Sequence, residues 1–180
     1  MDPIVLRRER VELLDGSLPR QPYHAAAEGG LSPDDAARLI SRVEQAATAA
    51  ARRVTESLLV ELRDSGQVVV GAGLVAGVRP IPVDLAEILA SHPLLHAAEG
   101  RLYEEAITES SAAVALPVLA LEPKSLLAET ATTLGVSTTD LTAGLAAAGK
   151  RVGAPWQKDH REVATAALAA LRAGRAAPGR

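Results

Sequence analysis

Two short stretches of the chain carry ionisable side chains at helical spacing. In SHPLLHAAEG, residues 91–100, His92, His96 and Glu99 follow one another at intervals of four and three positions. A helix places residues at this spacing on one face, where imidazoles and a carboxylate can share a divalent metal ion. Pro93 follows the first histidine, so the H-E-x-x-H motif of metalloproteases is absent. The spacing therefore indicates a polar or metal-binding stripe of another kind.

The second stretch is KDHREVATAALAAL, residues 158–171, in which Asp159 and Glu162 lie three positions apart. Acidic side chains at the start of a helix are favoured by the helix dipole, whatever the function of the protein. The same pair also offers the oxygen ligands that Mg²⁺ prefers. The pattern is therefore compatible both with a simple helix terminus and with part of a magnesium site.

Zinc is the alternative metal for the two histidines. The chain contains no cysteine, which excludes disulfides, thiolate zinc sites and a cysteine nucleophile. A zinc ion on His92 and His96 would need further ligands, for which Asp159, His160 and Glu162 are candidates. The simpler interpretation of the histidine stripe is a solvated or hydrogen-bonded face of an ordinary helix.

The composition indicates a soluble globular protein, which we expect to form one domain over 1–180. Hydrophobic residues make up 48% of the chain and aromatic residues 2%, so the core must consist of Leu, Val, Ile and Ala. A net charge of −3, with scattered basic residues, argues against bulk electrostatic binding of nucleic acid. Neither a secretory leader nor a long apolar run is visible, which predicts a cytoplasmic protein without membrane contact.

Predicted strands and helices alternate along the chain. Ser32, followed by Pro33 and two acidic residues, is expected to cap a long helix. Runs of Val and Leu predict strands, and clusters of Pro and Gly predict loops. The strands are expected at 4–14, 67–70 and 116–121, the helices at 32–64, 83–89, 92–111, 125–134, 137–148 and 158–173, a loop at 16–30 and a frayed tail at 174–180. This order predicts an α/β fold, a layered domain with a central, partly parallel sheet flanked by helices.

Residues 71–76, GAGLVA, match the G-x-G-x-x-A form of the dinucleotide-binding motif and follow a predicted strand. The motif requires a helix that opens at the glycines and presents its N-terminal amides to the pyrophosphate. Pro80 and Pro82 follow too closely for such a helix. We therefore expect no nucleotide cofactor and attribute these glycines to a turn or to close packing.

From Glu99 to the C-terminus, the layout resembles the second half of the ribonuclease H-like superfamily, especially its Holliday-junction resolvase branch. The match lies in the strand LPVLALEP and in a closing helix where Asp159 and Glu162 precede the apolar run 163–171. The resemblance implies a ribonuclease H-like fold and a nuclease dependent on Mg²⁺ or Mn²⁺. The metal ligands that it implies are Glu99, Asp159 and Glu162, and these are also the implied catalytic residues, with His96 or His160 positioning water or a phosphate. The implied nucleic-acid contacts are Lys124, Lys150, Arg151 and Lys158. His92 and His96 are candidate metal ligands on their helical spacing, independently of the resemblance.

The chain departs from this family in its first predicted strand, IVLRRERVELL, which lacks the expected aspartate. Two other functions therefore stay open. The protein could be a non-catalytic interaction protein that forms a homodimer or binds a partner through the 32–64 helix. Alternatively, it could be a metal-binding hydrolase that uses the two histidines and Glu99.

Overall fold

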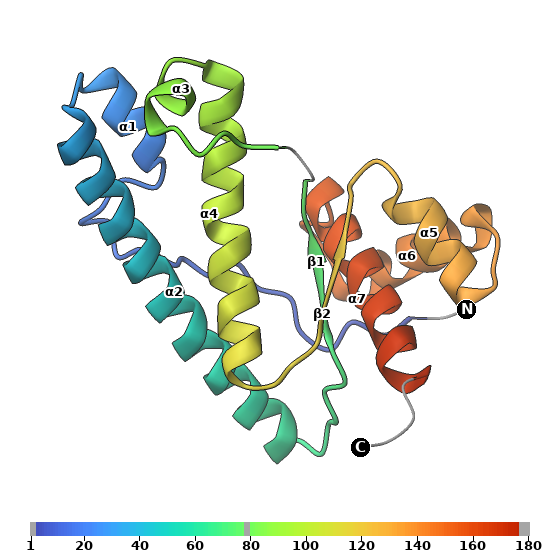
Figure 1. Ribbon diagram of the computed structural model, residues 1–180. Helices are drawn as coiled ribbons and strands as arrows, with labels where there is room; N and C mark the ends of the chain where they lie inside the picture. Colours follow the sequence, from blue (N-terminus) through green and yellow to red (C-terminus); the bar gives the residue numbers. More distant parts are fainter. Residues whose placement is uncertain (1–2, 78–79, 177–180) are drawn as a thin grey trace. The chain divides into compact units, whose positions relative to one another are not determined.

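The structure is a computed structural model in which residues 3–77 and 80–176 are described. It is predominantly helical, with 63% of the residues in helices and 5% in strands. Its sheet has only two strands and is no central layer flanked by helices (Figure 1). The predicted α/β, ribonuclease H-like fold is therefore wrong. Short apolar runs look like buried strands in a sequence, but a segment enters a sheet only where another strand pairs with it.

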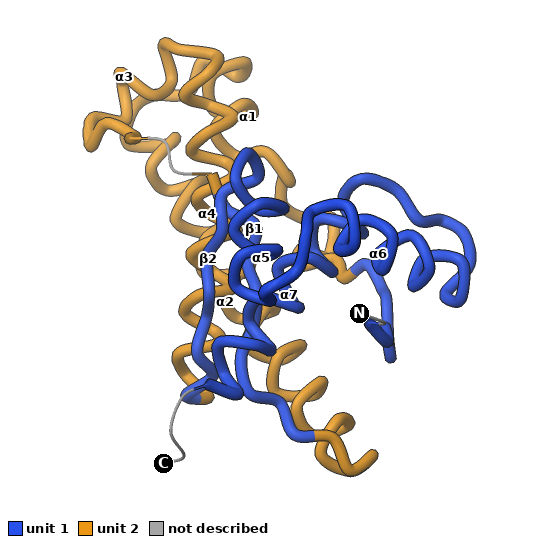
Figure 2. The backbone as a smooth tube through the Cα atoms, turned by 90° about the vertical axis from the view of Figure 1, so that its right-hand side faces the viewer, with its two compact units in different colours: residues 1–10, 68–76, 115–180 blue, residues 11–67, 77–114 orange. Residues whose placement is uncertain are grey.

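The chain divides into two compact units, which Figure 2 shows in different colours. Unit 1 comprises residues 1–10, 68–76 and 115–180, and unit 2 comprises residues 11–67 and 77–114. Each unit thus joins segments that are distant in the sequence. The single domain expected over 1–180 stays a prediction, and the two units are described separately below.

Unit 2 is built on two long helices, α2 (Pro33–Asp64) and α4 (His92–Ala113), both at the positions predicted from the sequence. The Ser32 side chain caps α2 by accepting the backbone N–H of Asp35, as expected. The two helices run in the same direction (Figure 1). The hydroxyls of Thr55 on α2 and Ser110 on α4 lie 3.2 Å apart. Small side chains let the helices approach closely. The buried cluster consists of Leu14, Val43, Ala47, Ala51, Leu102 and Ala106.

Two short helices complete unit 2. Helix α3 (Leu85–Leu89) begins at Asp84, whose carboxylate accepts the backbone N–H of Ala86. Helix α1 (Pro22–Glu28) buries Pro22, His24 and Ala26. The predicted loop over 16–30 is wrong for these seven residues. Proline at the first position suits a helix start, and an alanine run favours helix, but the flanking Pro and Gly residues masked both signals.

Unit 1 contains the sheet. Strand β1 (Ala72–Val75) pairs in parallel with β2 (Val118–Leu121), and Ala72 lies opposite Val118. Helix α7 (Lys158–Ala176) packs on β1 so closely that a Cβ on Gly73 would lie 2.2 Å from the carbonyl oxygen of Ala166. Gly73 of the dinucleotide-like motif thus belongs to a strand, and Gly71, just before it, lies so close to the Pro117 carbonyl that a Cβ would be 3.3 Å from its oxygen. Both glycines serve close packing, one of the two roles predicted for them.

Of the three predicted strands, one is confirmed and two are wrong. The 116–121 strand is confirmed over 118–121, whereas the 67–70 strand is wrong, because pairing occurs five residues later in the glycine-containing segment. The 4–14 strand is also wrong, since this segment has no regular secondary structure. Its Arg8 guanidinium instead donates to the carbonyl oxygens of Gly153, Ala154 and Pro155. Side-chain hydrogen bonds from Arg8 therefore anchor this segment, in place of the backbone hydrogen bonds of a β-sheet that the sequence predicted.

Helices α5 (Leu126–Leu134) and α6 (Thr138–Val152) complete unit 1 and confirm the predicted helices there. Gly135 ends α5 in the left-handed conformation, with φ of 68°, and the Ser137 side chain caps α6. Helix α7 extends to Ala176, so the predicted frayed tail is wrong for 174–176, while 177–180 lie outside the described residues. None of the helices in the described ranges is long and apolar enough to span a membrane.

Candidate metal centre

The polar stripe of α4 faces α1. His92, His96, Glu99 and Tyr103 are spaced by four, three and four positions, so they share one face of the helix. The Tyr103 hydroxyl donates to the backbone carbonyl of Arg20, which precedes α1, at 2.7 Å. Glu99 is 6% exposed and its carboxylate reaches the start of α1. The part of the stripe formed by Glu99 and Tyr103 thus contacts α1 and the residues before it, and is not a solvated face.

One oxygen of Glu99 organises the start of α1. Its Oε1 accepts the backbone N–H groups of Tyr23 at 2.9 Å and of His24 at 3.1 Å. The residue at the N-cap position of α1, Gln21, makes no capping hydrogen bond with its side chain. Glu99 therefore does from α4 what an N-cap side chain does locally, and its charge also suits the positive end of the helix dipole.

The same oxygen orients the imidazole of His24. Its Nδ1 lies 3.3 Å from Glu99 Oε1. A carboxylate oxygen accepts hydrogen bonds, so Nδ1 is the donor in this contact, and in the neutral imidazole this tautomer leaves a lone pair on Nε2. His24 Nε2 is buried and, within the part of the chain that is described, has no hydrogen-bond partner. A buried nitrogen of this kind is expected to have a water or an ion as its partner.

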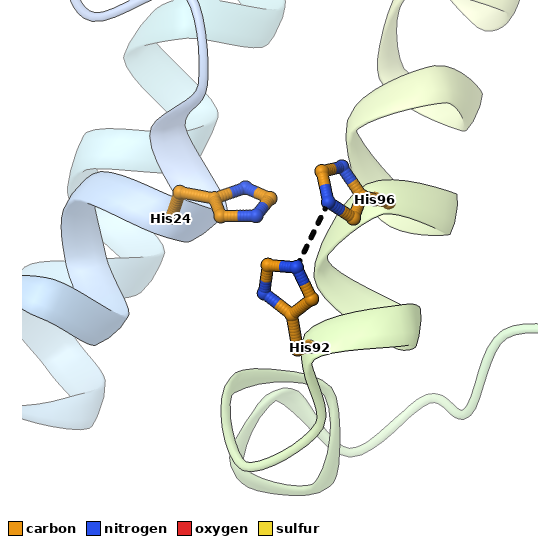
Figure 3. A group of neighbouring side chains, drawn as sticks. All are labelled: His24, His92 and His96. Atoms are coloured by element: carbon orange, nitrogen blue, oxygen red, sulfur yellow. Dashed lines mark hydrogen bonds between the residues drawn. The ribbon is translucent and has the colours of Figure 1, made fainter.

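Three histidines converge at this point. Figure 3 shows the His24 ring, from α1, directed at the rings of His92 and His96 from α4. The Nε2 atoms of His92 and His96 are 3.1 Å apart, and all three residues offer ligand atoms within 4.8 Å of one another. Tetrahedral zinc with nitrogen ligands at 2.0–2.1 Å requires nitrogen–nitrogen distances of about 3.3 Å. The three histidines therefore lie close enough to hold a metal ion.

The burial of the three rings differs. His24 is buried, whereas His92 and His96 are exposed, so these two side chains can shift to complete a coordination sphere. His24 also lines a surface hollow of about 530 Å³. The other residues around the hollow are Pro19, Arg20, Gln21, Ala25 and Glu28.

Two tyrosines beside the centre stay protonated over a wide pH range. Burial raises the pKa of Tyr23 to about 12, and the charges of Glu44, Glu105 and Glu99 add to the effect. Burial likewise raises the pKa of Tyr103, again with a contribution from Glu99. Both phenols are therefore neutral hydrogen-bond donors at physiological pH rather than negatively charged metal ligands.

The carboxylates of α7 belong to the other unit. Asp159 is exposed, and Glu162 forms an ion pair with Lys158 at 3.5 Å, one turn away on the same helix. The His160 ring accepts the backbone N–H of Gln157 at 3.1 Å and stacks on Trp156. Glu162 and His160 thus have their partners within their own segment. The metal site predicted from Glu99, Asp159 and Glu162 stays a prediction, and so does the nuclease activity attached to it.

The predicted nucleic-acid contacts all lie in unit 1. Lys124 precedes α5, Lys150 and Arg151 lie in the last turn of α6, and Lys158 begins α7. Two of them have protein partners, because Arg151 donates to the carbonyl of Pro3 and Lys158 pairs with Glu162. Binding of nucleic acid stays a prediction, as does a homodimer through α2.

Sequence reasoning found His92, His96 and Glu99 but missed His24. The cause is that helix α1 was predicted to be part of a loop. A loop gives no spacing from which a neighbour of His24 could be predicted. The donor set also differs from the one behind the Mg²⁺ or Mn²⁺ prediction, because it contains imidazoles rather than carboxylates. A helix signal at Pro22, followed by three alanines, was the available hint.

Comparison with known proteins finds no matching family model, no matching curated protein and no matching solved structure. The function is therefore argued from the site alone.

Proposed function

We propose that the protein binds one divalent transition-metal ion, best matched by Zn²⁺, through His24, His92 and His96. The observation that carries this proposal is the convergence of three imidazoles from two helices within 4.8 Å of one another. Imidazole suits zinc, copper, nickel and iron, whereas Mg²⁺ prefers oxygen ligands. The contact between Glu99 and His24 Nδ1 adds support, because carboxylates commonly orient the histidine ligands of zinc.

Hydrolysis by a metal-bound water is a second function, favoured by the number of ligands and by their exposure. Three protein ligands leave a coordination position free for water, and catalytic zinc sites have this arrangement. His92 and His96 are exposed, so solvent and a substrate can reach the ion. Zinc lowers the pKa of its bound water to about 7. The resulting hydroxide, its proton having passed to solvent, would attack the carbonyl carbon of an ester or the phosphorus of a phosphodiester. The C–O or P–O bond to the leaving group would then break, and the departing alkoxide would take a proton from solvent.

Metal binding is tested with tag-free protein that has been stripped with a chelator. Calorimetric titration with ZnCl₂ is expected to give one equivalent, and free zinc at 100 times Kd should stabilise the fold by about 2.7 kcal/mol. His24→Ala and His96→Ala should each lose most of this stabilisation, since each removes one of three ligands. His160→Ala is the matched control, because this histidine lies in unit 1 and should leave zinc binding unchanged.

The proposal fails if zinc does not bind, or if binding survives both His24→Ala and His96→Ala. Mg²⁺ at the same concentration should produce no comparable shift in the melting temperature. Hydrolysis is tested separately, with 4-nitrophenyl acetate and bis(4-nitrophenyl) phosphate as probes. Zinc-dependent turnover that disappears in His96→Ala supports the hydrolase. A zinc-loaded protein with no turnover above the His96→Ala background contradicts it, while leaving metal binding intact.

A further inference from the structure

Helix α1 packs on α2, is hydrogen-bonded to α4, and depends on such tertiary contacts for its stability. It has seven residues, whereas an isolated helix needs about 12–15 to be even marginally stable in water. Its first amides donate to Glu99, and the carbonyl just before it accepts from Tyr103. These hydrogen bonds exist only while α1 lies against α4. The helix and its docking therefore form and break together.

His24 links this docking to the candidate metal ion. Two of the three imidazoles come from α4, and the third comes from α1. An ion can have all three ligands only when α1 is docked, and it keeps two when α1 is released. The ion thus binds the docked state more tightly, and by linkage its binding must favour docking to the same degree.

We infer that metal binding locks α1 onto α4, and that Glu99 couples the two events. This inference rests on the proposed metal binding. Glu99 Oε1 caps the amides of Tyr23 and His24 and also holds the imidazole of His24 with Nε2 free. The hollow beside His24 is lined by α1 and the residues before it, so the segment that carries His24 also forms this hollow.

Hydrogen exchange measured by mass spectrometry tests the coupling in the full chain. If zinc binds only the docked state, exchange in a peptide covering 19–30 should slow about 100-fold at free zinc of 100 times Kd. A peptide covering 158–176 in unit 1 reports on any general effect and should be unchanged. Zinc that binds by calorimetry but leaves 19–30 unaltered overturns the inference and not the proposed function. Absence of zinc binding removes both.

The role of Glu99 is tested with Glu99→Gln, which keeps an oxygen for the α1 amides but loses the charge facing His24. We expect its zinc Kd to rise by about 10–100-fold, as for other groups that orient metal ligands. Glu109→Gln, an exposed acid on the same helix, should leave the Kd unchanged. Exchange in the metal-free variant shows whether α1 still docks. An unchanged zinc Kd in Glu99→Gln overturns the role of Glu99. A raised zinc Kd supports that role, both when α1 stays docked and when it is released.

Discussion

The beginning of α4 and the beginning of α7 look alike in the sequence and behave differently in the structure. Each places at least one histidine and at least one acidic residue within two helical turns. At α7 these groups pair locally: Glu162 with Lys158, and His160 with the Gln157 amide and Trp156. At α4 they meet a second helix, which supplies two backbone amides and a third imidazole. A cluster on one helix becomes a candidate site only when another element brings a further ligand to it.

The acidic residues of the two helices, Glu99 on α4 and Glu162 on α7, also differ in what they bind. Glu99 is 6% exposed and its Oε1 has three hydrogen-bonding contacts in α1. Glu162 has an ion pair with an exposed lysine, and such pairs contribute about 0–1 kcal/mol. The two carboxylates thus have the same chemistry and very different importance for stability.

The largest effect is expected from Glu99→Ala. This change leaves the amides of Tyr23 and His24 unsatisfied and opens a cavity, which should lower the free energy of unfolding by about 2–4 kcal/mol. Asp159→Ala and Glu162→Ala should each stay within about 0.5 kcal/mol of the wild type. Urea unfolding of metal-free protein, followed by circular dichroism, measures the difference. Equal losses in Glu99→Ala and Glu162→Ala would refute the distinction.

Local signals in the sequence predicted most of the helices. Ser32 and Ser137 cap α2 and α6, and Gly135 ends α5, because each acts on neighbouring backbone groups. The stripe on α4 was also visible, since its spacing is a property of one helix. These features depend only on neighbouring residues, so they can be predicted without knowing how the rest of the chain folds.

What the sequence concealed depends on distant partners. Strand β1 forms at Ala72–Val75 rather than in 67–70, which is richer in valine, because Gly73 allows the close approach of Ala166 on α7. Helix α1 is capped by Glu99, which lies 76 positions after Tyr23 in the sequence. No pattern of neighbouring residues therefore predicts this helix start. His24 was missed for this reason, and with it the third ligand of the candidate metal centre.

An intermediate effect is expected at Gly149 in α6, where a Cβ would lie 2.3 Å from Cδ1 of Trp156. Gly149→Ala should displace the Trp156 ring at a cost of about 1–3 kcal/mol. The emission of this single tryptophan should shift, while zinc affinity stays unchanged. Gly100→Ala on α4 is the matched control, because its nearest neighbour is 4.0 Å away. That change should stabilise the protein by up to about 1 kcal/mol.

The smallest effect concerns the exposed acids around α4. Burial raises the pKa of Glu44, and repulsion from Glu105 and Glu109 raises it further. A pKa raised in the folded state means that stability falls as pH rises through the carboxyl's ordinary range near 4.5. Glu44→Gln should therefore stabilise the protein by a few tenths of a kcal/mol, roughly, at pH 7, because solvent screens this group.

The gain in Glu44→Gln should disappear near pH 4, where the carboxyl is protonated in the unfolded chain as well. Urea midpoints of the variant and the wild type at the two pH values measure it. Glu56→Gln is the control on the same helix, because Glu56 pairs with Arg52 and should gain nothing from neutralisation. A gain at pH 4 equal to that at pH 7 would mean that charge is not its cause. Charge repulsion among Glu44, Glu105 and Glu109 would then no longer distinguish these acids from the hydrogen-bonded carboxylate of Glu99.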